Sequence, residues 1–120
     1  MKLADLHPRF LRYEKRLEEG KERVYHVGVE TLAEAQGVIF LCPKCFAANH
    51  GEVGTHSVIC WSSSRGVPVG AHPGPGRWAM KGTSLADLTL DGEPGRSRSV
   101  LLKGGCGWHG YITKGEATDA

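Results

Sequence analysis

Two short cysteine motifs, far apart in the sequence, constrain the fold of this chain more than any other feature. One is Cys42-Pro43-Lys44-Cys45 and the other is Cys106-Gly107-Trp108-His109, so together they supply three thiols and one imidazole. Such a set completes the tetrahedral coordination of a structural zinc ion. About 60 residues separate the motifs, whereas the two halves of zinc-finger signatures are separated by roughly 12 to 20. The sequence therefore predicts a Zn²⁺ site, formed by Cys42, Cys45, Cys106 and His109, that ties the middle of the chain to its end.

The composition explains why such a cross-link would matter. Glycine contributes 17 of 120 residues, about twice its average share, which favours turns over helix. A structural zinc site contributes about 10 to 16 kcal/mol in small peptides, as much as the roughly 5 to 15 kcal/mol that stabilises a whole domain. We expect a β-rich α+β fold, a small single domain of short antiparallel strands and long Gly/Pro loops, closed by the zinc site.

The chain divides into three parts. Residues 1–22 are highly charged, and the spacing of Phe10, Tyr13 and Leu17 allows either a short helix or a solvated arm leaning on the domain. Residues 23–116 are expected to form the zinc-binding β-rich domain, and residues 117–120 a frayed tail. Within the domain, strands are expected at 23–30, 38–41, 56–61, 78–81, 85–90, 99–102 and 111–113, with helical turns at 31–36 and a long loop at 62–77.

Other cysteine and histidine residues leave the ligand set open. Cys60, on an expected strand, is either a small buried apolar group or a fourth thiolate in place of His109. His50 and His56 could also reach the metal. The spacing of the two motifs favours His109, but it does not exclude these three residues.

A redox pair at Cys42 and Cys45 is the competing interpretation of the first motif. That chemistry needs the first thiol at the N-terminus of a helix, where its pKa is lowered. Residues 46–51 do not favour a helix, and a redox pair would leave Cys106 and His109 unexplained. The sequence therefore favours metal binding.

Enzymatic signatures are sparse in the sequence. The phosphate-binding, serine-hydrolase and zinc-protease motifs are absent. The best catalytic lead is His50-Gly51-Glu52, which has the His-x-Glu order of zinc deaminases but follows the Cys-Pro-Lys-Cys segment instead of preceding it. A zinc-dependent hydrolase or deaminase-like enzyme would need an open metal position near His50, Glu52 or His56. Three thiolates and an imidazole leave no such position, so the sequence favours a non-enzymatic binding module.

Charge and hydropathy bear on compartment and partners. The net charge of +2 is too small to indicate nucleic-acid binding by itself. No apolar run has the length of a signal peptide core at the start or of a membrane span anywhere, so we expect a cytoplasmic protein with reduced thiols and no membrane partner. A protein or nucleic-acid partner would bind the loops at 62–77 and 91–98, and the oligomeric state stays open. These loops carry Arg65, Arg77, Arg96 and Arg98.

Several segments together resemble a known family. They lie at 40–45, 77–78, 82–90, 99–102 and 105–115, and the most specific is Gly-Cys-Gly-Trp-His-Gly-Tyr-Ile-Thr-Lys-Gly at 105–115. On these segments the chain resembles a family of small phage, prophage and bacterial proteins defined as a domain of unknown function. The resemblance implies a zinc-associated, β-rich fold, encoded by a phage or prophage, without an established activity. The family's Ser-Pro-Ser before the last strand is Ser97-Arg98-Ser99 here.

Overall fold

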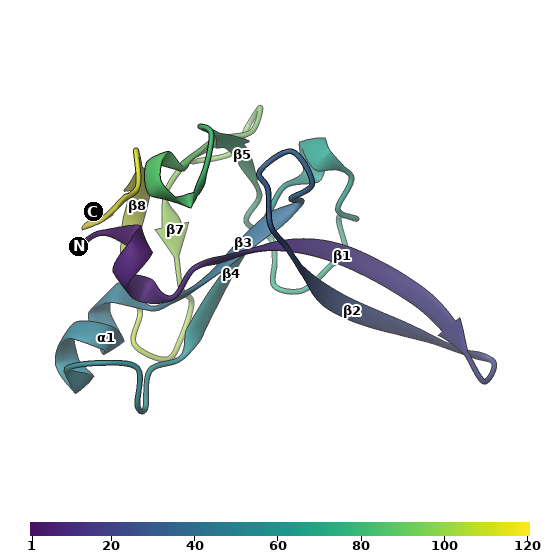
Figure 1. The fold of residues 1–120 in the computed structure, drawn as a ribbon, viewed down its shortest axis with the longest axis horizontal. Helices are drawn as coiled ribbons and strands as arrows, with labels where there is room; N and C mark the ends of the chain where they lie inside the picture. Colours follow the sequence, from purple (N-terminus) through teal and green to yellow (C-terminus); the bar gives the residue numbers. More distant parts are fainter.

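Antiparallel strands make up most of the computed structural model, which describes residues 1–120 and contains one α-helix (Figure 1). The expected β-rich α+β class is confirmed. The strands are β1 (Arg9–Glu18), β2 (Lys21–Val29), β3 (Gly37–Leu41), β4 (Ser57–Trp61), β5 (Trp78–Lys81), β6 (Thr89–Gly92), β7 (Val100–Leu101), β8 (His109–Thr113) and β9 (Glu116–Asp119). The helical elements are α1 (Pro43–Asn49) and the 3₁₀ turns η1 (Leu3–Leu6), η2 (Ser63–Arg65) and η3 (Leu85–Asp87).

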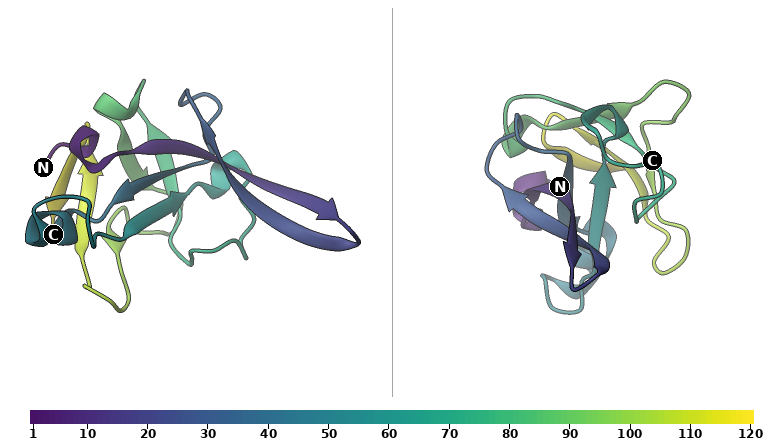
Figure 2. Two further views of the ribbon diagram at one scale, coloured as in Figure 1. Left: turned by 60° about the horizontal axis from the view of Figure 1, so that its bottom comes forward. Right: turned by 90° about the vertical axis from the view of Figure 1, so that its right-hand side faces the viewer.

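The strands form three antiparallel sheets. The largest has the order β2-β1-β3-β4, β5 pairs with β6, and β7-β8-β9 form the third. β1 pairs with β2 as far as Glu18, but with β3 only from Arg9 to Leu11. The outer part of the β1–β2 hairpin therefore projects from the body, as Figures 1 and 2 show. This projection makes the molecule 43 Å long against 30 Å and 27 Å in the other directions.

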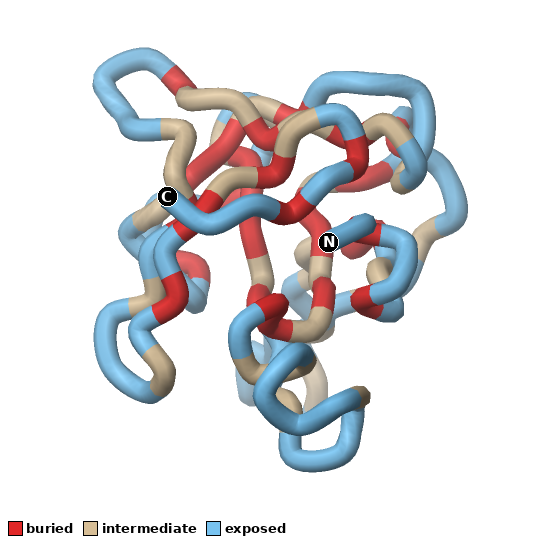
Figure 3. Tube along the Cα trace, turned by 90° about the vertical axis from the view of Figure 1, so that its left-hand side faces the viewer, coloured by how far each residue is buried: buried red, intermediate tan, exposed pale blue.

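One large core lies where the three sheets meet. It contains 18 buried residues, contributed by β1, β3 and β4 of the large sheet, by β5 to β9 of the smaller ones, by η1 and by the turns next to these strands. The rings of Phe40 on β3 and Trp108 meet edge-on, 6.2 Å between centroids, which joins the large sheet to the C-terminal part. Figure 3 shows the buried residues gathered toward the middle of the fold and exposed residues in the segments that project from it. A smaller cluster under the Gly/Pro loop consists of Leu11, Trp61, Val67 and Ala71.

The first 22 residues are part of this sheet structure, where an arm or a short helix was expected. Leu3 and Leu6 of η1 are fully buried, and the whole of β1 follows. Glu19 and Gly20 have positive φ (51° and 75°), which is the conformation of a tight two-residue hairpin turn. The helix alternative is wrong because these residues pair with β2 as a strand. The apolar residues behind that alternative do not share one buried face: Phe10 is buried, but Leu17 is 78% exposed. The expected boundary at residue 22 falls within this hairpin.

The last residues are also ordered, where a frayed tail was expected. Lys114 and Gly115 have positive φ (48° and 76°) and form a second tight turn, after which β9 pairs with β8. Asp119 accepts a hydrogen bond from the indole N–H of Trp108 at 2.9 Å. A backbone N–H of β9 donates to the carbonyl of Met1, so the two ends of the chain lie side by side.

Most expected strands lie close to their predicted positions, but three local predictions differ from the structure. The strand expected at 85–90 is replaced by the 3₁₀ turn η3 and then by β6, which begins only at Thr89. Residues 31–36 form a turn without a helix, although the backbone N–H of Glu34 donates to the Thr31 hydroxyl at 3.3 Å, as it would at a helix cap. Residues 43–49 form α1, where a tight turn was expected. None of the helices has the length and apolar character needed to span a bilayer.

Candidate metal centre

Four side chains with metal-binding atoms converge near the start of α1: Cys42, Cys45, His56 and Cys106, with one donor atom of each within 4.8 Å of the others. The sulfurs of Cys42 and Cys106 are 3.5 Å apart, and His56 Nε2 is 3.4 Å from the Cys106 sulfur. Around a tetrahedral zinc ion, two sulfurs would be about 3.8 Å apart, and a sulfur and an imidazole nitrogen about 3.6 Å. All four cysteines of the chain are free thiols. The cluster can therefore hold a metal ion with three thiolates and one imidazole.

β3 and α1 place the first two thiols. Cys42 follows β3 directly, and Pro43 occupies the first helical position, where its missing N–H costs no hydrogen bond. Cys45 lies three residues further on, which in a helix returns its side chain to the same side. Burial raises the pKa of the Cys42 thiol to about 11, although backbone N–H groups at Cys45 and Lys44 donate to it. A bound cation would stabilise the thiolate against this burial.

A glycine-rich turn presents the third thiol. Gly104, Gly105 and Gly107 have positive φ (95°, 57° and 68°), a conformation that residues with a Cβ avoid. The turn carries Cys106 to the start of α1, where the ammonium group of Lys44 donates to the Cys106 carbonyl at 2.8 Å. The three glycines are therefore needed for the path of the backbone around the thiol.

The surroundings of Cys106 favour its ionised form. Desolvation by itself would raise the pKa of this thiol. Hydrogen bonds from His56, from the backbone N–H of Trp108 and from the other two thiols of the cluster outweigh that effect and lower the pKa to about 6. A thiolate at this position supplies the negative charge that attracts a cation to the cluster.

His56, the residue before β4, supplies the imidazole. The backbone N–H of Cys42 donates to the His56 carbonyl at 2.9 Å, so the pairing of β3 with β4 sets these two residues side by side. His56 Nε2 faces the sulfur of Cys106, and Nδ1 lies 3.4 Å from the carbonyl oxygen of Ser57. A carbonyl at the second ring nitrogen commonly fixes the tautomer of a metal-binding histidine. The sequence offered His56 only as an alternative ligand. It lies in no cysteine motif, and only the pairing of β3 with β4 brings it to the site.

His109, the expected fourth ligand, is outside this cluster. It is the first residue of β8 and pairs with Leu101. Trp108 turns into the core and is 2% exposed, so the alternation of side chains directs His109 to the opposite, exposed face. Its ring lies 6.5 Å from that of Tyr111. The Cys-x-x-His spacing returns an imidazole to the metal only where the chain keeps turning, and here it enters a strand.

The remaining candidate ligands also lie away from the four donors. Cys60 is buried in the apolar core, and burial raises the pKa of its thiol. His50 ends α1 with a left-handed backbone, and Glu52 pairs with His7 at 3.0 Å on the surface. A hydrolase or deaminase-like enzyme was expected to have an open metal position near His50, Glu52 or His56, and of these three residues only His56 belongs to the four-donor cluster.

The sequence argument against a redox pair assumed that no helix follows Cys42, and this assumption is wrong. α1 is present and Cys42 stands at its N-terminus, which is the position of the attacking thiol in dithiol oxidoreductases. However, Cys42 is fully buried and burial raises its pKa, whereas an attacking thiol needs access and a lowered pKa. A redox pair would also leave the approach of Cys106 and His56 unexplained.

All four arginines considered for partner binding donate hydrogen bonds within the protein. Arg65 donates to two backbone carbonyls of the turn at 31–36. Arg77 is 1% exposed, and its guanidinium group donates hydrogen bonds to backbone carbonyls of the surrounding Gly/Pro loop. The five carbonyls that accept from it belong to Pro68, Val69, Ala71, Pro73 and Gly76.

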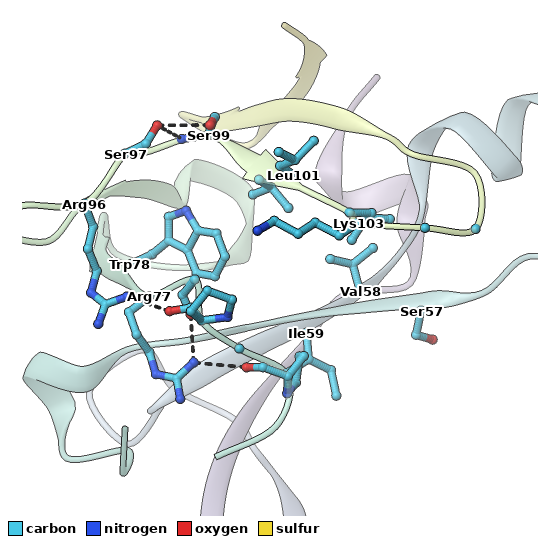
Figure 4. Close-up of a pocket in the computed structure, with 18 of the residues that line it drawn as sticks. Ser57, Val58, Ile59, Arg77, Trp78, Arg96, Ser97, Ser99, Leu101 and Lys103 are labelled. Atoms are coloured by element: carbon cyan, nitrogen blue, oxygen red, sulfur yellow. Dashed lines mark hydrogen bonds between the residues drawn. The ribbon is translucent and has the colours of Figure 1, made fainter. Parts of the chain in front are cut away.

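The other two arginines lie near a hollow of the surface with a volume of about 680 Å³. Arg96 lines this hollow and is exposed, and one of its guanidinium nitrogens donates to the Pro75 carbonyl at 2.6 Å. The guanidinium group of Arg98 donates to the Thr113 hydroxyl and lies 5.0 Å from the ring centre of Tyr111. Figure 4 shows β4 and β7 on facing sides of the hollow, with Trp78 and Arg96 near one end. His56 also belongs to its lining, so the hollow begins beside the cluster of four donors.

Comparison of the chain with protein-family models, curated proteins and solved structures gave no match. The indications of function are therefore the donor set of the cluster and the chemistry of the hollow beside it. The cluster can hold a metal ion within a small β-rich fold.

Proposed function

We propose that this protein is a Zn²⁺-stabilised, non-enzymatic binding module whose metal is held by Cys42, Cys45, His56 and Cys106. The observation that carries the proposal is the convergence of these four donors from three distant segments of the chain. Three thiolates and one imidazole are a typical structural zinc set, and they leave no coordination position for water or substrate. The metal then closes the fold and takes no part in a reaction.

The ligand chemistry favours zinc over other common metals. Thiolate and imidazole ligands select zinc over magnesium and calcium, which prefer oxygen donors. The cluster contains no carboxylate. With the metal in a closed site, the binding role falls to the surface beside it, where Arg96 stands exposed on the rim of the hollow.

Metal analysis by native mass spectrometry tests this assignment. We expect one zinc ion per chain in freshly purified, reduced protein, and loss or weakening of zinc binding in His56→Ala. The matched variants His109→Ala and Cys60→Ala should retain the zinc. Retention in His56→Ala together with loss in His109→Ala would contradict the ligand set.

The same experiment separates zinc binding from the redox alternative. A protein without metal that forms a reversible Cys42–Cys45 disulfide on mild oxidation would overturn the proposal. Zinc binding that protects both thiols from oxidation, with release of the thiols on chelation, would support it.

A further inference from the structure

The hollow beside the metal cluster lies between two sheet edges that have no neighbouring strand. β4 is the last strand of the four-stranded sheet, and β7 is the last strand of the sheet β7-β8-β9. Residues of both strands line the hollow, including Ser57, Ile59 and Leu101. An unpaired strand edge presents backbone N–H and C=O groups that can pair with an extended chain.

The hydrogen bonds of the two sheets show which backbone groups face the hollow. On β4, the bonds from Cys42 N–H to His56 and from Ser62 N–H to Gln36 place the bonded pairs at even-numbered residues of this strand. Because bonded residues alternate along an antiparallel strand, the backbone groups of Ile59 point away from β3. On β7, the N–H of Leu102 donates to the Trp108 carbonyl. By the same alternation, the backbone N–H and C=O groups of Leu101 point away from β8.

The side chains of the hollow combine an apolar floor with positive charge. Val58, Trp78 and Val100 are at least nine-tenths buried beneath it. Arg96 and Lys103 are exposed in its lining, which contains no aspartate or glutamate. Figure 4 shows Lys103 extending along the hollow toward Trp78. An acidic ligand would therefore meet complementary charge here.

An extended peptide fits these features better than a single-stranded nucleic acid. Nucleic-acid grooves without sequence preference present aromatic faces on which bases stack. Trp78, the indole in the lining, is only 7% exposed, and its N–H donates to the Arg98 carbonyl at 3.0 Å. The free edge of β4, in contrast, offers main-chain hydrogen bonds, which is how β-strand addition recognises extended peptides.

We propose that the hollow binds an extended segment of a partner protein carrying acidic side chains, which pairs as an added strand with β4 through the backbone of Ser57 and Ile59. Lys103 and Arg96 then meet the acidic side chains from the facing wall. This inference rests on the proposed binding function and specifies the partner class. The peptide proposal concerns the edge of β4, whereas the zinc proposal concerns the four-donor cluster, so one can fail without the other.

The test uses the zinc-loaded full chain, labelled with nitrogen-15, and a synthetic peptide of about eight residues, the length of an ordinary strand, that alternates valine and glutamate. We expect the amide signals of Ser57 and Ile59 to shift on titration and the Ile59 amide to become protected from hydrogen exchange. The same peptide with N-methyl groups at alternate residues should lose binding, because it can no longer pair with the strand edge on that side.

Charge variants complete the test. Lys103→Glu should weaken peptide binding about five- to tenfold, whereas Lys21→Glu, the same change at the distant end of the hairpin, should leave it within about twofold. The proposal is overturned if the peptide does not bind, if N-methylation has no effect, or if an oligothymidylate of similar length shifts the same amides at lower concentration. Zinc measured in the same samples shows whether the metal-site proposal survives that outcome.

Discussion

α1, whose start carries two of the four metal-binding donors, and the outer end of the β1–β2 hairpin lie at opposite ends of the molecule (Figure 1). The two regions are held together in different ways. Around the cluster, few backbone bonds join α1, the approach to β4 and the turn at 104–107, and four side chains meet at one point. In the hairpin, a ladder of backbone pairs runs without interruption from Phe10↔Val29 to Glu18↔Lys21. One end depends on a few converging side chains, and the other on many regular bonds.

Side-chain chemistry follows the same division. The outer hairpin carries charged pairs such as Arg16 with Glu14 at 2.6 Å, and the Arg16 guanidinium group lies 4.4 Å from the ring centre of Tyr25. Exposed pairs of this kind each contribute little to the free energy of unfolding, so the stability of the outer hairpin is distributed over many sites. If the cluster holds a zinc ion as proposed, each of its four ligands would carry a large share of the stability. The comparison predicts that substitutions near the metal have large effects and those in the outer hairpin small ones.

Metal removal should have the largest effect. A strong chelator under reducing conditions would remove an interaction worth on the order of 10 kcal/mol, which is comparable with the roughly 5 to 15 kcal/mol net stability of a whole domain. We expect the dispersed amide NMR spectrum to collapse and to return when zinc is added. A native-like spectrum in reduced, metal-free protein would show that the core holds the fold without the cluster.

The two candidate histidines should differ strongly in their effect on zinc affinity. His56→Ala removes a donor from the cluster and should weaken zinc binding by at least about 100-fold, above the range for groups that only support a ligand. His109→Ala removes an exposed ring and should leave the affinity within about threefold. Competition with a chromophoric chelator measures both. Equal effects of the two variants would contradict the choice of His56.

Arg77 is expected to stabilise the Gly/Pro loop from inside. Arg77→Met leaves five loop carbonyls without their donor, and we expect a loss of about 2 to 4 kcal/mol in the free energy of unfolding. Arg9→Met, at an exposed arginine without a hydrogen-bond partner, is the matched control. Urea unfolding of the zinc-loaded proteins gives both values. If Arg77→Met changed the free energy of unfolding as little as the control does, the hydrogen bonds of Arg77 would not be what stabilises the loop.

The smallest effect is expected at the outer end of β1. Leu17, which is 78% exposed, should change the free energy of unfolding by less than about 0.5 kcal/mol when replaced by alanine. Leu11 lies on the same strand but is 2% exposed, and Leu11→Ala should cost about 2 to 5 kcal/mol. The same urea titrations compare the two. A large effect of Leu17→Ala would indicate that the hairpin tip packs against another chain in solution.

Local sequence signals predicted a large part of the fold. The alternation of β-forming residues gave most strands, because a strand's pattern is set by its own side chains. The Glu19-Gly20 turn was also present in the sequence, but the weak helical spacing of Phe10, Tyr13 and Leu17 competed with it. The prediction failed there because burial of those side chains depends on what packs against them.

The sequence by itself determined the chemistry of the site: three cysteines in metal-binding spacing and a choice of histidines. Only the tertiary structure decided which histidine joins them, because the pairing of β3 with β4 sets His56 beside Cys42, while β8 turns His109 outward. It likewise decided that Arg77 is buried and Arg96 exposed, although both lie in Gly/Pro-rich loops. Spacing along the chain fixes which atoms are available, but long-range pairing fixes which of them meet.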